Sequence, residues 1–148
     1  MTDDESEFEI PNDPNVSTED IKPGANLEGA DLSDAYLFMA DLSTANLEGA
    51  DLSDANLRGA TLNGADLKNA ILNQASLQGV DLTVAELNGA ELSDADIRRG
   101  ELSGVDLSGA NLADANLYDA ALTDAFLKNA NFNHTDLTNA TLSDSDLR

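Results

Sequence analysis

The sequence feature that most constrains the fold is a Leu, or an Ile or Phe in its place, at every fifth residue from Leu27 to Leu147. The register is unbroken through 25 units of the form Ala-(Asp/Asn)-Leu-x-x, which begin at Ala25. Five residues of an α-helix turn through about 500°, which would scatter the leucines, and a strand alternates with a period of two. The period therefore predicts a coiled path in which each five-residue unit, or pentad, forms a short extended side followed by a corner of turn-forming residues.

A second, longer repeat sets the number of pentads in each coil. Residues 25–35 (ANLEGADLSDA) recur without change as residues 45–55, an offset of 20 residues. Looser copies begin at Ala85 and Val105, again displaced by multiples of 20. Four pentads therefore make one coil, and we expect about six coils to stack into a solenoid.

Two columns of this solenoid are predicted to point inward: the Leu position and the small residue two before it, which is Ala in 20 of 25 pentads. Coils stacked about 4.8 Å apart would place Leu on Leu, and each buried Leu contributes roughly 1.5–3 kcal/mol. A third column, at one corner, holds only Gly and Asn. Because both residues readily adopt positive φ, we predict a left-handed residue at this one corner. The column contains Gly29, Gly49, Asn69, Gly89, Gly109 and Asn129.

The tandem A(D/N)LXX units of residues 25–148 resemble the pentapeptide repeat family, and the resemblance runs without an insertion. It implies an all-β fold, a right-handed quadrilateral β-helix, with the Leu/Phe and small-residue columns inside. The best understood members of the family mimic DNA and bind type II topoisomerases such as DNA gyrase, protecting them from quinolone drugs or inhibiting them. Those relatives commonly carry a dimerising C-terminal extension, which is not evident here. We therefore expect either a monomer or an end-to-end homodimer.

The net charge limits the partners. The chain carries 29 acids and 7 bases, a formal charge of -22. Such a chain repels phosphates and anionic lipid, so we expect a protein partner and no direct contact with nucleic acid or membrane. There is no cysteine, hence no thiolate metal site or thiol nucleophile. No signal-peptide pattern or membrane-spanning run is evident, so a cytoplasmic protein is expected.

Residues 1–24 form a separate acidic segment without the pentad pattern. They contain eight acids, one Lys and three prolines, a composition typical of disorder. The segment also has apolar residues that could cover the first coil as a partial cap, and residues 17–20 (STED) resemble a helix start. Both interpretations remain open. The apolar residues are Phe8, Ile10, Val16 and Ile21.

Sorting the outward residues of 25–148 by the 20-residue register gives four faces of different charge. The acidic face, built on Leu32, has seven acids and no Lys or Arg, and we predict that its acids bind a partner: Asp31, Asp34, Asp51, Asp54, Glu91, Asp94 and Asp114. The face opposite, on Leu42, is also acidic and lacks a base. The mixed face, on Leu27, combines six acids with three bases. The neutral face, on Leu37, balances three acids with three arginines.

The neutral face carries the second candidate binding site. The residues one after each core position form a ladder of Phe38, Arg58, Gln78, Arg98, Tyr118 and Thr138. Because Arg and Tyr are enriched at binding hot spots, we predict that Arg58, Arg98 and Tyr118 contact a protein partner. The plainer alternative is that the aromatic rings shield backbone and that the arginines balance neighbouring acids such as Asp96.

Three explanations of the acidic surface remain open. The first is DNA mimicry directed at a type II topoisomerase: about six coils span roughly 29 Å, over which B-DNA presents about 17 phosphates. Residues 25–148 carry a comparable charge of -15, from 21 acids and six bases. The second is adaptation of a halophilic interaction or scaffold protein to concentrated salt. The third is solubility alone, because high charge keeps an open-ended repeat from stacking into fibres.

Catalysis, cofactor binding and metal binding are poorly supported. His134 is the only histidine, it occupies an outward turn position, and no second base is identifiable beside it. Stacked acids such as Asp31 and Asp51 would lie one coil spacing apart, but a flat exposed ladder has no pocket in which to shift a pKa or dehydrate a cation. The sequence therefore predicts a non-enzymatic, rod-like protein-binding module.

Overall fold

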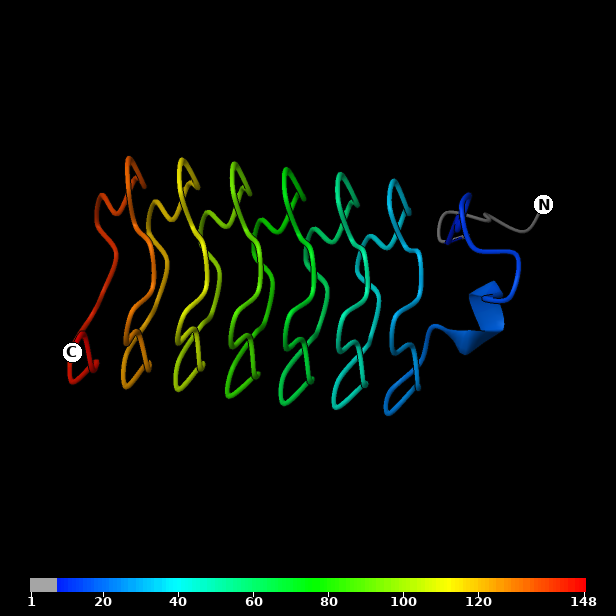
Figure 1. Ribbon diagram of the computed structural model, residues 1–148, viewed down its shortest axis with the longest axis horizontal. Coiled ribbons are helices and arrows are strands. Elements are labelled where there is room, and N and C mark those ends of the chain that lie inside the picture. The colour runs from blue at the N-terminus through cyan, green and yellow to red at the C-terminus, as the bar shows by residue number, and fades with distance from the viewer. Residues whose placement is uncertain (1–7) are drawn as a thin grey trace.

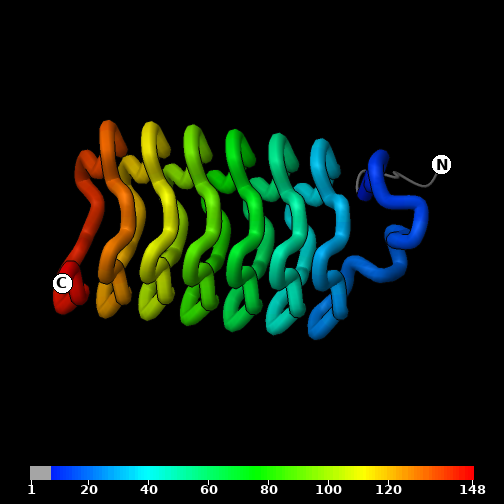
Figure 2. The backbone as a smooth tube through the Cα atoms, viewed as in Figure 1, coloured from blue at the N-terminus to red at the C-terminus, as the bar shows by residue number. Residues whose placement is uncertain are grey.

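The computed structural model describes residues 8–148, which form a rod of stacked coils (Figure 1). Successive coils lie side by side along the long axis, with the described N-terminal residues at one end and the C-terminus at the other (Figure 2). Parallel β-bridges join the second residue of each pentad to the residue 20 positions later, from Asn26 with Asn46 to Phe126 with Asp146. One coil therefore contains four pentads, as the sequence repeat predicts.

The coils are held by isolated bridges rather than by strands. Within residues 8–148 the pairing consists of single bridged residues, and the one named element is the 3-10 helix η1 (Thr18–Asp20). Each side of a coil has one bridged residue between two turns, so the pairing has no room to extend along the chain. The expected all-β coil is thus built from turns joined by single bridges.

The backbone N–H groups of a pentad are used systematically. The Leu27 N–H donates to the Asn46 carbonyl of the next coil (2.7 Å), and the Gly29 N–H donates to the Glu48 carbonyl (2.9 Å). The Ala30 N–H donates back to the Leu27 carbonyl (3.1 Å) and closes the turn. At the fourth position, the Glu48 N–H donates to the Asn46 side-chain oxygen (3.0 Å). Each of these backbone donors therefore has a partner, either in the next coil or within its own turn.

All four corners of the coil are left-handed: the predicted Gly/Asn corner is confirmed, but the restriction to a single corner is wrong. The fifth residue of every pentad has φ between 52° and 70°, from Gly24 to Asp144. This is the conformation required at the third residue of a type II turn. Asp and Asn adopt it more often than other residues that have a Cβ, so a search for Gly and Asn alone missed the corners built on Asp. Two β-branched residues also adopt it, Thr44 with φ of 55° and Val84 with φ of 52°.

The two predicted inward columns form the core. The Leu and small positions are buried from Ala25 to Leu127, most of them with 0–1% of their surface exposed. Gly100 replaces the inward Ala directly after Ile97, which replaces Leu. These two positions on each side of the coil therefore fill the interior along the rod.

Residues 8–24 lie over the first coil. Glu9 forms an antiparallel bridge with Tyr36, and each backbone N–H donates to the other's carbonyl (3.1 and 2.8 Å). Ile21 is buried, and Phe8, Ile10 and Val16 pack partly buried against the core. Residues 1–7 of the acidic segment lie outside the described residues.

The other end of the rod leaves its core partly exposed. Phe132, Leu137 and Leu142 are half-buried, and Leu147 is 64% exposed. The inward Thr135 hydroxyl donates to the Leu112 carbonyl at 2.7 Å, so this polar inward side chain is satisfied. No helix within residues 8–148 is long and apolar enough to cross a membrane.

Candidate functional site

A groove of about 380 Å³ lies on the neutral face. The 20-residue period stacks the fourth and fifth residues of pentads in successive coils into two adjacent columns, and these columns line the groove. The predicted residues Arg58, Arg98 and Tyr118 are therefore brought together in one depression. The complete lining is Phe38, Arg58, Gly59, Gln78, Gly79, Arg98, Arg99 and Tyr118.

Two glycines create the hollow in this face. Both adopt the left-handed conformation of the corner, with φ of 66° at Gly59 and 65° at Gly79. A methyl group added at Gly59 would collide with the Met39 Sδ, which lies over it, whereas one added at Gly79 would meet no atom within 4 Å. The open space is therefore above Gly79, with Met39 filling the adjacent position. The sequence shows the two glycines, but the placement of the Met39 side chain required the structure.

Asp96, on the same face, is hydrogen-bonded by two residues that line the groove, Gln78 and Arg98. The Arg98 guanidinium makes two bonds to Asp96, Nε to Oδ1 at 2.8 Å and Nη2 to Oδ2 at 2.7 Å. The Gln78 amide also donates to Asp96 Oδ2, at 2.5 Å. The hydrogen bond from Arg98 is the main cause that lowers the pKa of Asp96, partial burial opposes it, and Gln78 reinforces it. Arg98 is thus engaged by Asp96 and held in place.

Arg58 differs from Arg98 in its electrostatic environment. Among residues 8–148 no carboxylate forms an ion pair with it, and its neighbours one coil before and after are the uncharged Phe38 and Gln78. Arg99 is largely exposed, and its Nε lies 3.9 Å from Asp119 Oδ2. The groove therefore holds a guanidinium without a described partner, in a chain of charge -22.

Aromatic rings stand at both ends of the groove. Tyr36 and Phe38 are stacked, with ring centroids 6.2 Å apart, and remain 38% and 37% exposed. At the other end Tyr118 is half-buried, and the Asn139 amide donates to its hydroxyl at 3.4 Å. The groove is consequently polar in the middle and aromatic at its ends.

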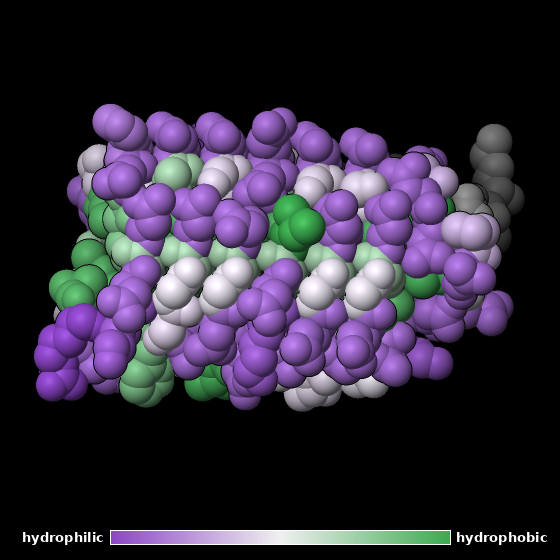
Figure 3. Space-filling view, in the orientation of Figure 1, coloured by the Kyte–Doolittle hydropathy of each residue, from purple (hydrophilic) through white to green (hydrophobic). Residues whose placement is uncertain are grey.

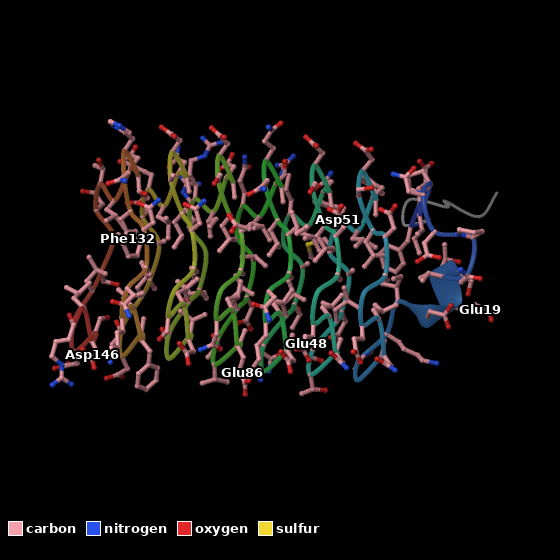
Figure 4. The ribbon with its side chains drawn as sticks, in the orientation of Figure 1. Glu19, Glu48, Asp51, Glu86, Phe132 and Asp146 are labelled. Atoms are coloured by element: carbon pink, nitrogen blue, oxygen red, sulfur yellow. The ribbon has the colours of Figure 1, made fainter. Side chains whose placement is uncertain are left out.

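The predicted residues of the acidic face lie on another side of the rod and do not meet the groove. Four of them occupy one exposed corner column: Asp34, Asp54, Asp94 and Asp114. Asp31 and Asp51 are the second residues of their pentads and are joined by a parallel bridge. In Figure 4 Asp51 lies on a different side from Glu48, Glu86 and Asp146, which follow one long edge of the rod. Hydrophilic side chains cover most of the face seen in Figure 3.

Little in the described residues resembles a catalytic or metal centre. No group of three or more His, Asp or Glu side chains within residues 8–148 is arranged to hold a metal ion. His134 is exposed at a corner with φ of 59°.

The protein is thus a solenoid with a groove on one of its sides. The family model of pentapeptide repeats matches the chain at residues 23–49, 35–77, 50–89, 75–114 and 115–148. The chain belongs to the pentapeptide repeat family. Proteins of this family form right-handed quadrilateral β-helices and are generally structural or protein-binding modules.

Three solved structures show the range of the likeness. A pentapeptide repeat protein from the thylakoid lumen of Arabidopsis thaliana is 37% identical, with 66% of this chain and 68% of that chain covered and a TM-score of 0.64. HetL, involved in heterocyst differentiation regulation in the cyanobacterium Nostoc sp. strain PCC 7120, is 38% identical, with coverages of 83% and 66% and a TM-score of 0.36. QnrB1, a plasmid-mediated fluoroquinolone resistance protein, is 21% identical, with coverages of 83% and 77% and a TM-score of 0.47. No curated protein sequence matches the chain.

Proposed function

We propose that this protein is a non-enzymatic binding module that holds a protein partner in the groove of its neutral face. The observation that carries the proposal is the convergence of Arg58, Arg98 and Tyr118 on one hollow. Interface hot spots are enriched in Arg and Tyr and lie where a partner side chain can fill a pocket. A groove of about 380 Å³ is within the range of ligand pockets, about 300–1,000 Å³.

The test is to replace Arg58, Arg98 and Tyr118 together by Ser and to recover partners from native cell extract. The three side chains are outside the core, so the variant should keep the circular dichroism and melting temperature of the wild type. We expect every specific partner of the wild-type rod to be lost from the variant, because both the cations and the aromatic anchor are removed.

A matched control exists on the mixed face. Replacing Lys128, Arg148 and Phe126 by Ser removes the same number of cations and one aromatic ring, and all three are exposed. This control should recover the partners of the wild type. Equal recovery by the groove variant and the control would remove the neutral face from consideration.

A second candidate function is DNA mimicry toward a type II topoisomerase. The corner column of exposed aspartates on the acidic face favours it, because it places carboxylates in register along the rod with no cation on that face. Under this proposal the acidic face competes with DNA for a basic surface of the enzyme, and inhibition of supercoiling weakens as salt screens the contact.

Mimicry is tested with a topoisomerase from the same organism. Neutralising Asp31, Asp34, Asp51, Asp54 and Asp94 to Asn should abolish inhibition while the rod stays folded. Wild-type protein that leaves supercoiling unchanged at large molar excess would eliminate this second function. The groove variant serves as the control, since its acidic face is intact.

A further inference from the structure

We propose that the segment held in the groove is an extended peptide of the partner that carries a carboxylate, with Arg58 as the residue that binds it. This inference rests on the proposed function of the groove and specifies the chemistry of its occupant. It follows from the charges, the shape and the length of the neutral face.

The charges single out Arg58. Asp96 accepts two hydrogen bonds from Arg98 and one from the Gln78 amide. The charge of Arg98 is therefore already balanced within the protein. Arg58 has no ion-pair partner among residues 8–148. A guanidinium binds a carboxylate through two parallel hydrogen bonds, so one unpaired Arg matches one carboxylate.

The shape supplies room for the rest of the segment. The hollow above Gly79 lies between the column positions of Arg58 and Arg98, and no atom is within 4 Å of the place a methyl group would take there. Toward the Phe38 end of the groove, Met39, 63% exposed, and the stacked pair of Tyr36 and Phe38 offer apolar surface. An apolar side chain next to the carboxylate would therefore be covered as the acid reaches Arg58.

The length selects an extended peptide of about six residues. From Phe38 to Tyr118 the ladder crosses four coil steps, about 19 Å at roughly 4.8 Å each, and an extended chain rises about 3.3 Å per residue. The backbone of the coils is already bonded between coils at this face, as in the bond from the Gly79 N–H to the Arg98 carbonyl (3.0 Å). Recognition is consequently by side chains rather than by addition of a strand.

The electrostatic field of the whole molecule restricts which sequences the bound peptide segment can have. A net charge of -22 repels anions at long range, so a run of acids or a doubly charged phosphate would be held away from the groove. A single carboxylate among apolar or basic residues avoids this repulsion, because basic neighbours would lie near the acidic faces that flank the groove. We therefore commit to one Asp or Glu in a segment that is otherwise neutral or basic.

The experiment uses displayed random heptapeptides selected on the full-length protein, with removal of those that also bind the Arg58→Gln variant. The enriched peptides should share one Asp or Glu beside an apolar residue. Their binding should shift the amide NMR signals of Arg58, Gly59, Gly79 and Arg98. Changing that acid to its amide should weaken binding about tenfold or more.

Two further variants make the assignment specific. Arg58→Glu should lose the acidic peptides and bind counterparts in which the acid is replaced by Lys. Arg148→Gln should bind like the wild type, because Arg148 is on the mixed face and is paired with Asp146.

Several outcomes would overturn the inference. One is a peptide that binds in the groove equally well with its acid and with the corresponding amide. That result would contradict the role of the carboxylate while leaving the proposed function of the groove intact. Another is a phosphorylated peptide that binds more tightly than its Asp counterpart, which would show that the groove selects phosphate rather than a carboxylate. If no peptide shifts the groove signals, the inference fails, and recovery of partners by the Arg58, Arg98 and Tyr118 variant independently decides the proposed function.

Discussion

At the residue scale, Asp and Asn stabilise the turns of the coil in the same way. At the second pentad position the Asp31 Oδ1 accepts the Ser33 N–H at 3.2 Å, and the Asn46 Oδ1 accepts the Glu48 N–H at 3.0 Å. This is the local bond by which Asx side chains stabilise turns. At the fifth position Asp and Asn both adopt φ near 59°. Because Asn can replace Asp at either position, the coil does not itself require the negative charge.

Val84 is the corner residue least suited to its conformation. Its φ is 52°, its side chain is branched at Cβ, and it is 58% exposed, so little packing offsets the strain. The left-handed region costs an ordinary L-residue roughly 1–2 kcal/mol. We expect Val84→Asn to raise the free energy of unfolding by about 1 kcal/mol in urea denaturation.

Gln74→Asn is the control for this prediction. Gln74 has the same conformation, with φ of 62°, but is not branched at Cβ. Its replacement by Asn should therefore give a smaller gain. Equal gains at the two positions would show that the benefit comes from Asn itself and that branching at Val84 adds no strain.

At the scale of the coil, Ile97 and Gly100 are a compensating pair. A methyl group on Gly100 would lie 3.0 Å from the Ile97 Cγ2 and 2.9 Å from the Leu102 Cδ1. Overpacking a close-packed interior typically costs about 1–3 kcal/mol. We expect Gly100→Ala alone to lower the free energy of unfolding by an amount in this range, measured by urea denaturation with the wild type alongside.

Adding Ile97→Leu should rescue the Gly100→Ala variant. The double variant restores the Leu-x-x-Ala arrangement found in most of the other pentads and removes the Ile97 Cγ2, one of the atoms closest to the added methyl group. The coupling between the two changes should be at least about 0.5 kcal/mol, as expected of residues in contact. Strictly additive effects would mean that Gly100 is retained for a reason other than Ile97.

The sequence predicts the core and the composition of the faces but not the groove or all the corners. The Leu and Ala columns were predictable because a regular period leaves one way to bury them. The period also placed Arg58, Arg98 and Tyr118 on one face. The left-handed corners could not be recognised where Asp, Met or Val stands in place of Gly. At those positions the hydrogen bonds between coils, and not the residue type, impose the conformation. The hollow depends on how Met39 lies over Gly59, which no periodicity encodes.

At the scale of the whole molecule, the question is what the net charge of -22 does to the rod. Like charges on a compact structure repel, and the repulsion is limited to about 3 Å in molar salt but reaches about 30 Å in very dilute buffer. Acids that are structurally replaceable by Asn therefore impose a cost that depends on salt. The salt dependence of the melting temperature therefore distinguishes a surface adapted to concentrated salt from one whose charge serves solubility alone.

We expect the wild-type melting temperature to fall steeply as salt is diluted, because the repulsion between the faces is then unscreened. The variant with Asp31, Asp34, Asp51, Asp54 and Asp94 changed to Asn should fall less, since it has five fewer charges and the same coil bonds. Replacing Lys128 and Arg148 by Ser adds two net negative charges and should have the opposite effect, a steeper fall. If all three proteins melt at the same temperature in dilute and concentrated salt, repulsion is not a significant term in this rod. Adaptation to salt would then no longer explain the acids, and their use would have to lie in solubility or in the binding of a basic partner.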